Sequence, residues 1–214
     1  MNEMRVLKRI VRAPFLRCGL LLAWLVFLAM PVNAQWVPEL DPIAPPLIAQ
    51  TCFACHGPGG ESVAPAIPSL AGLPRRYLVE VMQAYRYGGR FSTLMGRIMS
   101  AYDDAQIERL ADYFSRQPEP MMRQDVDWNL LGLGRQLHRR YCFECHGDPV
   151  NAPKPGVPRL HGRWMDYLRW TLRDYLVGIN QGDDEMSGAL ARLVRTQGEE
   201  GLEALLHYYG RGKP

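Results

Sequence analysis

Two short segments combine cysteine and histidine at the same spacing. One is CFACHG at 52–57 and the other is CFECHG at 142–147, so each carries the pattern C-x-x-C-H. Two thiols and an imidazole this close together could form a disulfide, a zinc site, a redox-active dithiol or an attachment point for haem. The spacing of the two segments and their surroundings discriminate between these four chemistries.

The first three chemistries fit the chain poorly. Paired C-x-x-C motifs of zinc ribbons are typically about 15–20 residues apart, whereas Cys55 and Cys142 are 87 positions apart. A redox dithiol expects a βαβ setting, and no alternating strand pattern of useful length occurs here. A disulfide within each motif stays possible, but it leaves the repeated histidine unexplained.

C-x-x-C-H is the attachment signature of haem c. The two thiols form thioethers with the vinyl groups on one edge of the porphyrin, and the adjacent histidine is held under the iron as its proximal ligand. We therefore expect two covalently bound haem c groups. Their expected thioether residues are Cys52, Cys55, Cys142 and Cys145, and their expected proximal ligands are His56 and His146.

The motifs belong to a longer internal repeat with an offset of 90 positions. The register continues without a gap from the motif through a loop rich in glycine and proline and into the segment beyond it. The matched pairs after the motif are Pro65/Pro155, Pro68/Pro158, Leu70/Leu160, Gly72/Gly162, Tyr77/Tyr167, Leu78/Leu168, Tyr85/Tyr175 and Gly88/Gly178. Two homologous, all-helical domains of about 80 residues are the simplest explanation.

Helical periodicity places the elements that must hold these motifs. A helix is expected to lead into each motif, most clearly in NLLGLGRQLHRRYC, and another to follow each loop, over roughly 74–87 and 164–177. Apolar residues at helical spacing predict closing helices around 107–114 and 202–209. Asp103 and Gln106 form a capping box for the first of these, and the segment 118–128 is the expected linker.

A second axial ligand is expected at a similar distance downstream of each proximal histidine. Electron-transfer cytochromes usually place Met opposite His. Met95 follows His56 by 39 positions, and Met186 follows His146 by 40 positions in the expected loop GDDEMSG. Met99 is the main rival of Met95, but its spacing fits the repeat less well.

Histidines elsewhere leave bis-His ligation as an alternative. His138, His161 and His207 all lie in the second half and have no histidine counterpart in the first, so we interpret them as core or surface residues. Pro68 and Pro158 each follow a proximal histidine by 12 positions. A backbone carbonyl at this point could accept the histidine Nδ1 proton and fix the ring.

The N-terminal segment 1–34 has the composition of a secretory signal peptide. Five basic residues precede an apolar run of about a dozen residues, shorter than the roughly 20 needed to span a bilayer, and cleavage is expected near Ala34–Gln35. The segment holds five of the 25 Lys and Arg and one of the 22 Asp and Glu. The remaining 20 basic and 21 acidic residues give a net charge of −1. We expect a periplasmic protein without a membrane span after cleavage, and no nucleic-acid partner.

These features resemble the dihaem class I cytochromes c, and in particular the cytochrome subunit of flavocytochrome c sulfide dehydrogenase. The closer resemblance lies in STLMGRI at 92–98 with Tyr102 and AQIERLADYF, and in RWMDYLRWTLRDY at 163–175 and GEEGLEALLHYYG at 198–210. It extends from about 45 to 212. Ala101 departs from the glycine usual before the tyrosine.

The resemblance implies an all-α chain of two tandem class I cytochrome c domains related by internal duplication. The expected order is a signal peptide at 1–34, a first domain at 35–120, and a linker with the second domain at 121–214. Met95 and Met186 would be the distal iron ligands. The chain would pair with a sulfide-oxidising flavoprotein subunit that carries FAD, in a sulfide:cytochrome c oxidoreductase. It would pass single electrons to a soluble cytochrome c or a similar acceptor, without a catalytic site of its own. The alternative is a free dihaem shuttle that supplies a terminal oxidase.

Overall fold

The structure, a computed structural model, describes residues 46–149, 151, 153–180 and 184–212. These ranges contain α-helices and one short 3-10 helix and no strand, which confirms the all-helical prediction. The expected signal peptide at 1–34 and the start of the first domain lie outside the described residues. No helix in the described ranges has the length and apolar character needed to cross a bilayer.

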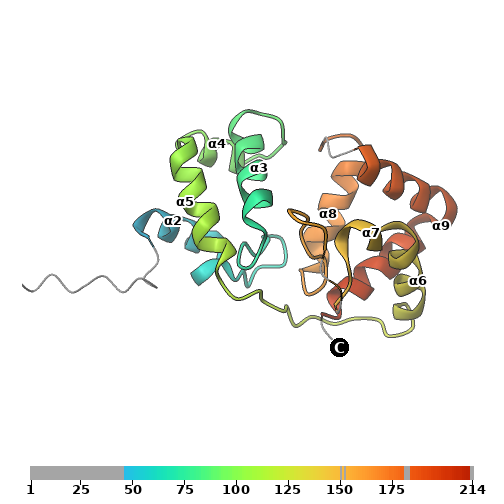
Figure 1. The fold of residues 1–214 in the computed structure, drawn as a ribbon. Helices are drawn as coiled ribbons and strands as arrows, with labels where there is room; N and C mark the ends of the chain where they lie inside the picture. The colour runs from blue at the N-terminus through green and yellow to red at the C-terminus, as the bar shows by residue number, and fades with distance from the viewer. Residues whose placement is uncertain (1–45, 150, 152, 181–183, 213–214) are drawn as a thin grey trace, which may run out of the picture. The chain divides into compact units, whose positions relative to one another are not determined.

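The described part of the first half contains four α-helices and a 3-10 turn. They are α2 (Leu47–His56), η1 (Pro58–Gly60), α3 (Arg75–Arg86), α4 (Met95–Met99) and α5 (Asp104–Ser115). Helix α3 packs against α4 and α5, and α2 packs against α5 (Figure 1). Their shared core centres on Leu78, Ile107, Leu110 and Phe114, of which α5 supplies the last three. The apolar residues expected on one side of α3 and of α5 therefore pack together in one core.

The N-terminus of α5 is closed by the capping box expected from the sequence. The Asp103 carboxylate accepts a hydrogen bond from the Gln106 backbone N–H at 2.7 Å, and the Gln106 side chain accepts one from the Asp103 N–H at 2.8 Å. These bonds satisfy backbone donors that the first turn of a helix otherwise leaves unpaired.

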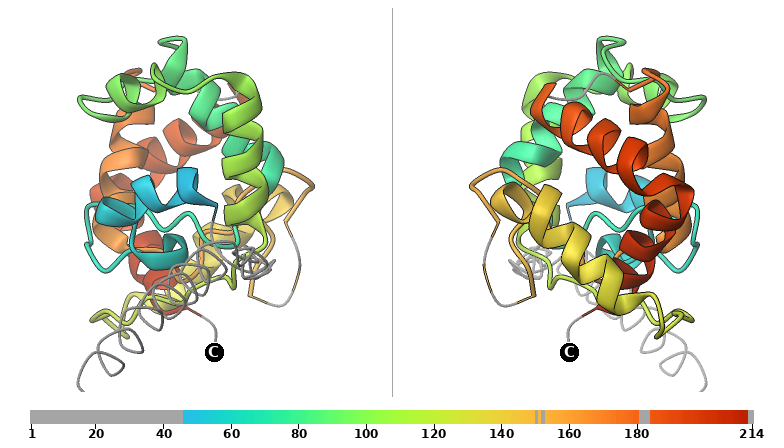
Figure 2. Two further views of the ribbon diagram at one scale, coloured as in Figure 1. Left: turned by 90° about the vertical axis from the view of Figure 1, so that its left-hand side faces the viewer. Right: turned by 90° about the vertical axis from the view of Figure 1, so that its right-hand side faces the viewer.

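The second half contains the corresponding helices. They are α6 (Leu131–Tyr141), α7 (Phe143–His146), α8 (Met165–Leu176) and α9 (Asp184–Gly210). Helix α9 packs against both α6 and α8, and Figure 2 shows α6 in yellow beside α9 in red. The core gathers Leu168 and Leu172 of α8 with Leu193, Leu202 and Leu205 of α9.

Helix α9 is longer than the closing helix predicted around 202–209. It begins at Asp184 and continues through a non-helical glycine, Gly198, with φ 65° and ψ −162°. Asp184 and Glu185 lie in its first turn, where acidic side chains interact favourably with the helix dipole. The expectation that Met186 lies in a loop is therefore wrong, because Met186 belongs to this first helical turn.

Several specific contacts join the two halves within the described part of the chain. The Trp164 indole N–H donates to the Ser62 carbonyl at 3.0 Å, and the Tyr167 backbone N–H donates to the Pro65 carbonyl at 3.0 Å. Arg163 is only 6% exposed and forms an ion pair with Glu119 at 3.1 Å. Because this buried guanidinium needs a partner, Glu119 fixes the segment between α5 and α6 to the start of α8.

Candidate haem-binding sites

The first C-x-x-C-H motif occupies the last two turns of α2. Cys52, Cys55 and His56 lie on this helix, and Gly57 follows it with φ 78°. A Cβ atom at Gly57 would lie 1.9 Å from the Glu61 carbonyl oxygen, so no other residue type fits this reversal without movement. The glycine of the motif thus lets the chain turn back beside the histidine.

The second motif has the same order of residues but a divided helix. Cys142 lies between α6 and α7, while Cys145 and His146 lie on the short helix α7. Gly147 again follows with a positive φ, here 58°. The two halves therefore reproduce one backbone reversal directly after the histidine, as their common register predicts.

Each motif histidine is oriented by a proline carbonyl. The distance from His56 Nδ1 to the Pro68 carbonyl oxygen is 2.8 Å, and the distance from His146 Nδ1 to the Pro158 carbonyl oxygen is also 2.8 Å. These contacts confirm the role expected for the two prolines. Because the carbonyl can only accept, Nδ1 must carry the proton, and Nε2 keeps the lone pair that a metal requires.

Burial keeps both imidazoles in the form that binds metals. Desolvation lowers the pKa of His56 and His146, and the proline carbonyl opposes this effect only in part. A neutral imidazole with a fixed tautomer is the state in which histidine ligates iron. The first-half and second-half histidines are thus prepared in the same way.

The motif thiols are available for covalent attachment. The four cysteines of the two motifs have free thiols, and the first cysteine of each motif, Cys52 or Cys142, packs partly buried against the core of its half. Burial raises the pKa of both of these thiols, so they remain protonated at neutral pH. A disulfide within either motif, the alternative left open above, is not formed.

Met95 begins helix α4, and its backbone N–H donates to the Ser92 hydroxyl at 2.8 Å. Its side chain packs partly buried against the first core, whereas its rival Met99 is a full member of that core and only 2% exposed. Met186 packs partly buried against the second core in the same manner. The structure thus gives Met95 and Met186 similar settings.

Partly buried residues of the same types pack on both cores. In the first half they include Cys52, Tyr77, Tyr85 and Met95. In the second half they include the residues at matching places, Cys142, Tyr167, Tyr175 and Met186. A thiol, a thioether, a nearby neutral imidazole and an apolar wall fit the donor set of a covalently attached haem with His/Met ligation.

A hydrogen bond that no sequence motif predicts connects the first motif to the segment after α4. The hydroxyls of Thr51 and Tyr102 lie 2.8 Å apart, which links the residue before Cys52 to the segment just after α4. Tyr102 is one of the residues that carry the family resemblance, whereas Thr51 belongs to no recognised motif. Only the folded chain brings these two residues together.

The remaining histidines serve the second half in other ways. His138 is fully buried, with Nδ1 3.0 Å from the Tyr209 hydroxyl and Nε2 2.6 Å from the Gly147 carbonyl. His161 is 1% exposed and packs edge-to-face against His138. His207 Nδ1 accepts the Asp127 N–H at 2.9 Å. The interpretation of His138 and His161 as core residues is confirmed.

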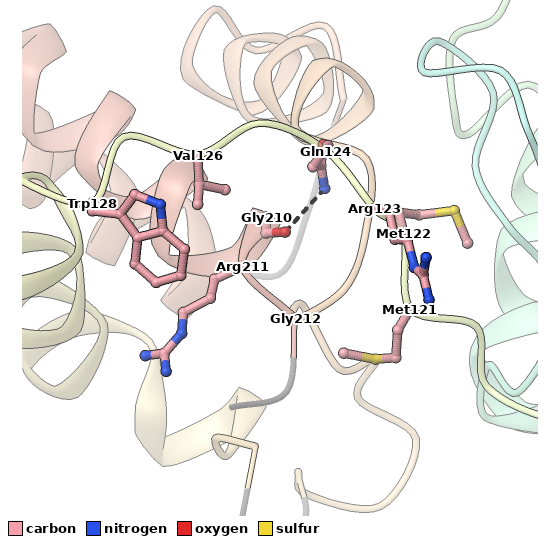
Figure 3. A pocket seen from close by; sticks show the side chains of 9 residues that line it. All are labelled: Met121, Met122, Arg123, Gln124, Val126, Trp128, Gly210, Arg211 and Gly212. Atoms are coloured by element: carbon pink, nitrogen blue, oxygen red, sulfur yellow. Dashed lines mark hydrogen bonds between the residues drawn. The ribbon is translucent and has the colours of Figure 1, made fainter.

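A shallow groove of about 330 Å³ lies apart from both motifs, between the linker and the C-terminal end of α9 (Figure 3). Its lining residues are Met121, Met122, Arg123, Gln124, Val126, Trp128, Gly210, Arg211 and Gly212. The Gln124 side-chain amide points to the Gly210 carbonyl and lies 3.4 Å from it. The groove contains none of the expected haem residues. Because Gln124 of the linker contacts Gly210 of α9, the groove lies where the linker packs on the second half.

Two sites of this kind, one in each helical half, define the class of c-type cytochromes. The family model for cytochrome c matches residues 46–117. Cytochrome c4 from Azotobacter vinelandii is 31% identical over 163 residues, covering 67% of this chain and 77% of the relative. Cytochrome c4 from Pseudomonas aeruginosa is 32% identical over 154 residues, with 67% and 76% covered. The thiosulfate dehydrogenase electron acceptor of Thiomonas intermedia is 28% identical over 158 residues, with 69% and 73% covered.

Solved structures agree with these relatives. Reduced cytochrome c4 from Pseudomonas stutzeri superposes with a TM-score of 0.66 at 29% identity, covering 75% of this chain and 92% of that one. A thiosulfate dehydrogenase from Marichromatium purpuratum gives a TM-score of 0.61 at 26% identity, covering 74% of this chain and 36% of that one. The chain belongs to the class I dihaem cytochromes c of the cytochrome c4 type. It is an electron carrier with two tandem domains and covalently bound haem c.

Proposed function

We propose that this dihaem cytochrome carries single electrons in the periplasm, from the FAD of a sulfide-oxidising flavoprotein subunit to a soluble acceptor such as a cytochrome c. The observation that carries the electron-transfer part is the repeated geometry of the two sites. In each half an imidazole is fixed by a proline carbonyl at 2.8 Å, and a methionine thioether packs on the adjoining core. Haem c supplies a one-electron couple when it is bound there.

We assign one role to each kind of site residue. The thioether attachments are Cys52, Cys55, Cys142 and Cys145, and the axial ligands are His56 with Met95 and His146 with Met186. Hydrogen bonding of each Nδ1 to a carbonyl strengthens the imidazole as a donor, while a methionine opposite it raises the reduction potential. With these side chains in both axial positions, neither haem would offer a place for substrate, so we propose that the chain carries electrons without a catalytic site of its own.

The donor proposal rests on the resemblance around the first-half methionine and on the relatives. The Thr51–Tyr102 hydrogen bond gives the STLMGRI segment and its tyrosine a structural connection to the first motif. A relative is named as the electron acceptor of a thiosulfate dehydrogenase, which supports a dehydrogenase of a reduced sulfur compound as the partner. We favour the flavoprotein of a sulfide:cytochrome c oxidoreductase, with which the chain would form a heterodimer.

A free shuttle to a terminal oxidase is the second candidate. It is favoured by the cytochrome c4 relatives, whose similarity extends across both halves of the chain. Its haem sites would be identical, so only the partner separates the two functions.

Affinity purification of the mature holoprotein from the periplasm of its native host tests the proposal. We expect a co-purifying chain with a flavin absorption spectrum, and rapid reduction of both haems when sulfide is added to the complex. Thiosulfate serves as the matched control donor. Purification without a flavoprotein, or reduction by thiosulfate alone, would overturn the sulfide assignment while leaving the carrier function intact.

A further inference from the structure

His138 lies at the centre of a hydrogen-bonded network that spans the second motif. Its side chain is fully buried. Its Nε2 atom lies 2.6 Å from the carbonyl oxygen of Gly147, the residue after His146, and its Nδ1 atom lies 3.0 Å from the Tyr209 hydroxyl. The Tyr209 hydroxyl is in turn hydrogen-bonded to the Cys142 thiol. One buried histidine and one buried tyrosine therefore connect the first cysteine of the motif to its last glycine.

The direction of each hydrogen bond in this network follows from the protons available. The Gly147 carbonyl can only accept, so His138 Nε2 carries a proton. Burial lowers the pKa of His138, so the ring is neutral at neutral pH and Nδ1 presents a lone pair. Burial also raises the pKa of Tyr209 well above its ordinary value, so its hydroxyl keeps its proton. This proton is donated to His138 Nδ1, and the tyrosine oxygen turns a lone pair towards the Cys142 sulfur.

The first half has an apolar side chain at both of these places. Ile48 lies 90 positions before the histidine and packs on the first core. Phe114 corresponds to Tyr209, because each is the last residue but one of its closing helix, α5 or α9. Their carbonyls also accept matching hydrogen bonds at 2.9 Å, from the backbone N–H of Gly72 and of Gly162. At these two positions the polar network therefore belongs to the second half alone.

The backbone of the two motifs shows what the network replaces. Helix α2 continues through both cysteines of the first motif, and the Gly57 carbonyl accepts the Gly60 backbone N–H at 2.9 Å. In the second motif the helix is divided at Cys142, where φ −124° and ψ −29° are not helical. The Gly147 carbonyl there accepts the His138 side chain. A side chain thus satisfies the carbonyl that a backbone N–H satisfies in the first half.

We propose that His138 and Tyr209 are positioning residues of the second haem site, which hold both ends of its motif and turn the tyrosine oxygen towards the Cys142 sulfur. This inference rests on the haem sites proposed above. The sulfur is the point at which the porphyrin is attached, so a partial negative charge on the neighbouring oxygen stabilises the oxidised, more positive state. Since Ile48 and Phe114 provide no such oxygen in the first half, the network lowers the reduction potential of the second haem alone.

Redox titration of the holoprotein, followed by NMR of the haem methyl groups, tests the proposal. NMR separates the two haems and assigns the one attached to Cys142 through its thioether. Tyr209→Phe removes the oxygen and copies Phe114, and we expect the reduced-to-oxidised ratio of the second haem, at a fixed solution potential, to rise by about threefold while that of the first is unchanged.

Tyr208→Phe is the matched control for this change. The Tyr208 ring packs against His138 with 5.4 Å between the ring centres, but both ring nitrogens of His138 have other partners. Removal of the Tyr208 hydroxyl should therefore leave the network intact. Equal titration curves of the second haem in Tyr209→Phe and Tyr208→Phe, or equal shifts of both haems in Tyr209→Phe, would overturn the inference.

Two variants of the histidine separate positioning from packing. His138→Leu removes both hydrogen bonds of the ring and frees the Tyr209 hydroxyl to donate to the thioether sulfur, which favours the reduced state, so the ratio of the second haem should rise at least as much as in Tyr209→Phe. His138→Gln can donate to the Gly147 carbonyl and accept from the tyrosine, and is expected to stay within about twofold of wild type. An equal rise in His138→Gln and His138→Leu would overturn the positioning role, because lost packing alone would then explain both.

Haem content is measured before any titration. A wild-type chain without two haems would refute the haem sites themselves, whereas two haems with wild-type ratios in every variant would refute only this inference. If His138→Leu does not fold, Tyr209→Phe provides the test by itself, because it removes a single oxygen atom. None of these results depends on whether sulfide is the donor.

Discussion

The carbonyl oxygen of Ala204 on α9 lies so close to Gly134 on α6 that a Cβ atom at Gly134 would be only 2.1 Å from it. The missing side chain allows the two helix backbones to touch where they cross. This crossing joins the helix that leads into the second motif to the helix that carries Met186 at its other end. The absence of a side chain at Gly134 therefore permits the close packing of α6 against α9.

Gly134→Ala should destabilise the second half. The added methyl group cannot occupy its position without separating α6 and α9, which is expected to lower the free energy of unfolding by about 1–3 kcal/mol. Gly132 is the matched control on the same helix, because a Cβ atom there meets nothing within 4 Å. Gly132→Ala should instead stabilise by about 0.5–1 kcal/mol. Chemical unfolding of the holoproteins measures both, and equal effects would contradict the assigned role of the crossing.

Exchange of the proposed axial methionines should change one haem at a time. Met95→Ala and Met186→Ala are each expected to remove about half of the weak near-infrared band that reports a methionine–iron bond, since we assign one such ligand to each site. Met99 is the control, because its side chain belongs to the core. Met99→Leu should keep the full band. Loss of intensity in Met99→Leu, with Met95→Ala unaffected, would transfer the ligand role to Met99.

Glu119→Gln should weaken the attachment between the two halves. The change leaves Arg163, with a side chain only 7% exposed, without its charged partner. Hydrogen bonds to charged groups contribute roughly 1.5–3 kcal/mol, and we expect a loss of stability in the lower part of this range because Glu119 itself is one-quarter exposed. Glu80→Gln breaks the exposed Arg76–Glu80 pair and should cost less than about 0.5 kcal/mol. Thermal unfolding of both variants measures the two losses of stability. Equal losses would show that Arg163 finds another partner when Glu119 is replaced.

The fold was largely predictable because the internal repeat shows the same helical pattern in both halves of the chain. Leu78 and Leu168 predicted α3 and α8 from helical spacing, and the Asp103–Gln106 capping box fixed the start of α5. The start of α9 was not predicted. Gly198 interrupts its apolar pattern, so the periodicity of the closing segment does not connect to the Asp184 turn.

The candidate haem residues and the contacts of the proline carbonyls could also be predicted from spacing, because both depend on distances along one segment. The contacts that join distant segments could not be predicted in this way. Thr51 meets Tyr102, and His138 meets His161, only after the chain has folded.

The stability of the second half should depend on pH through His161. His161 is buried against His138, Tyr208 and Tyr209, and neither of its ring nitrogens has a hydrogen-bond partner. Burial lowers its pKa to about 3, and the neighbouring charges of His138 and Arg159 act in the same direction, with Asp148 opposing them. An unfolded histidine has a pKa of about 6.5, so the unfolded chain binds the additional proton first.

The stability that His161 contributes as a neutral group is therefore complete above about pH 6.5 and is lost as the pH falls towards 3. Below the unfolded pKa this loss approaches about 1.4 kcal/mol per pH unit for one proton. His161→Gln cannot take up that proton, so between pH 6 and pH 4 its free energy of unfolding should fall less steeply than that of wild type by about this amount per unit. Urea unfolding of both holoproteins across this range measures the two slopes. A pH-independent difference in stability between the variant and wild type does not affect the comparison of these slopes. Parallel slopes would mean that His161 is protonated in the folded protein and has found an acceptor there.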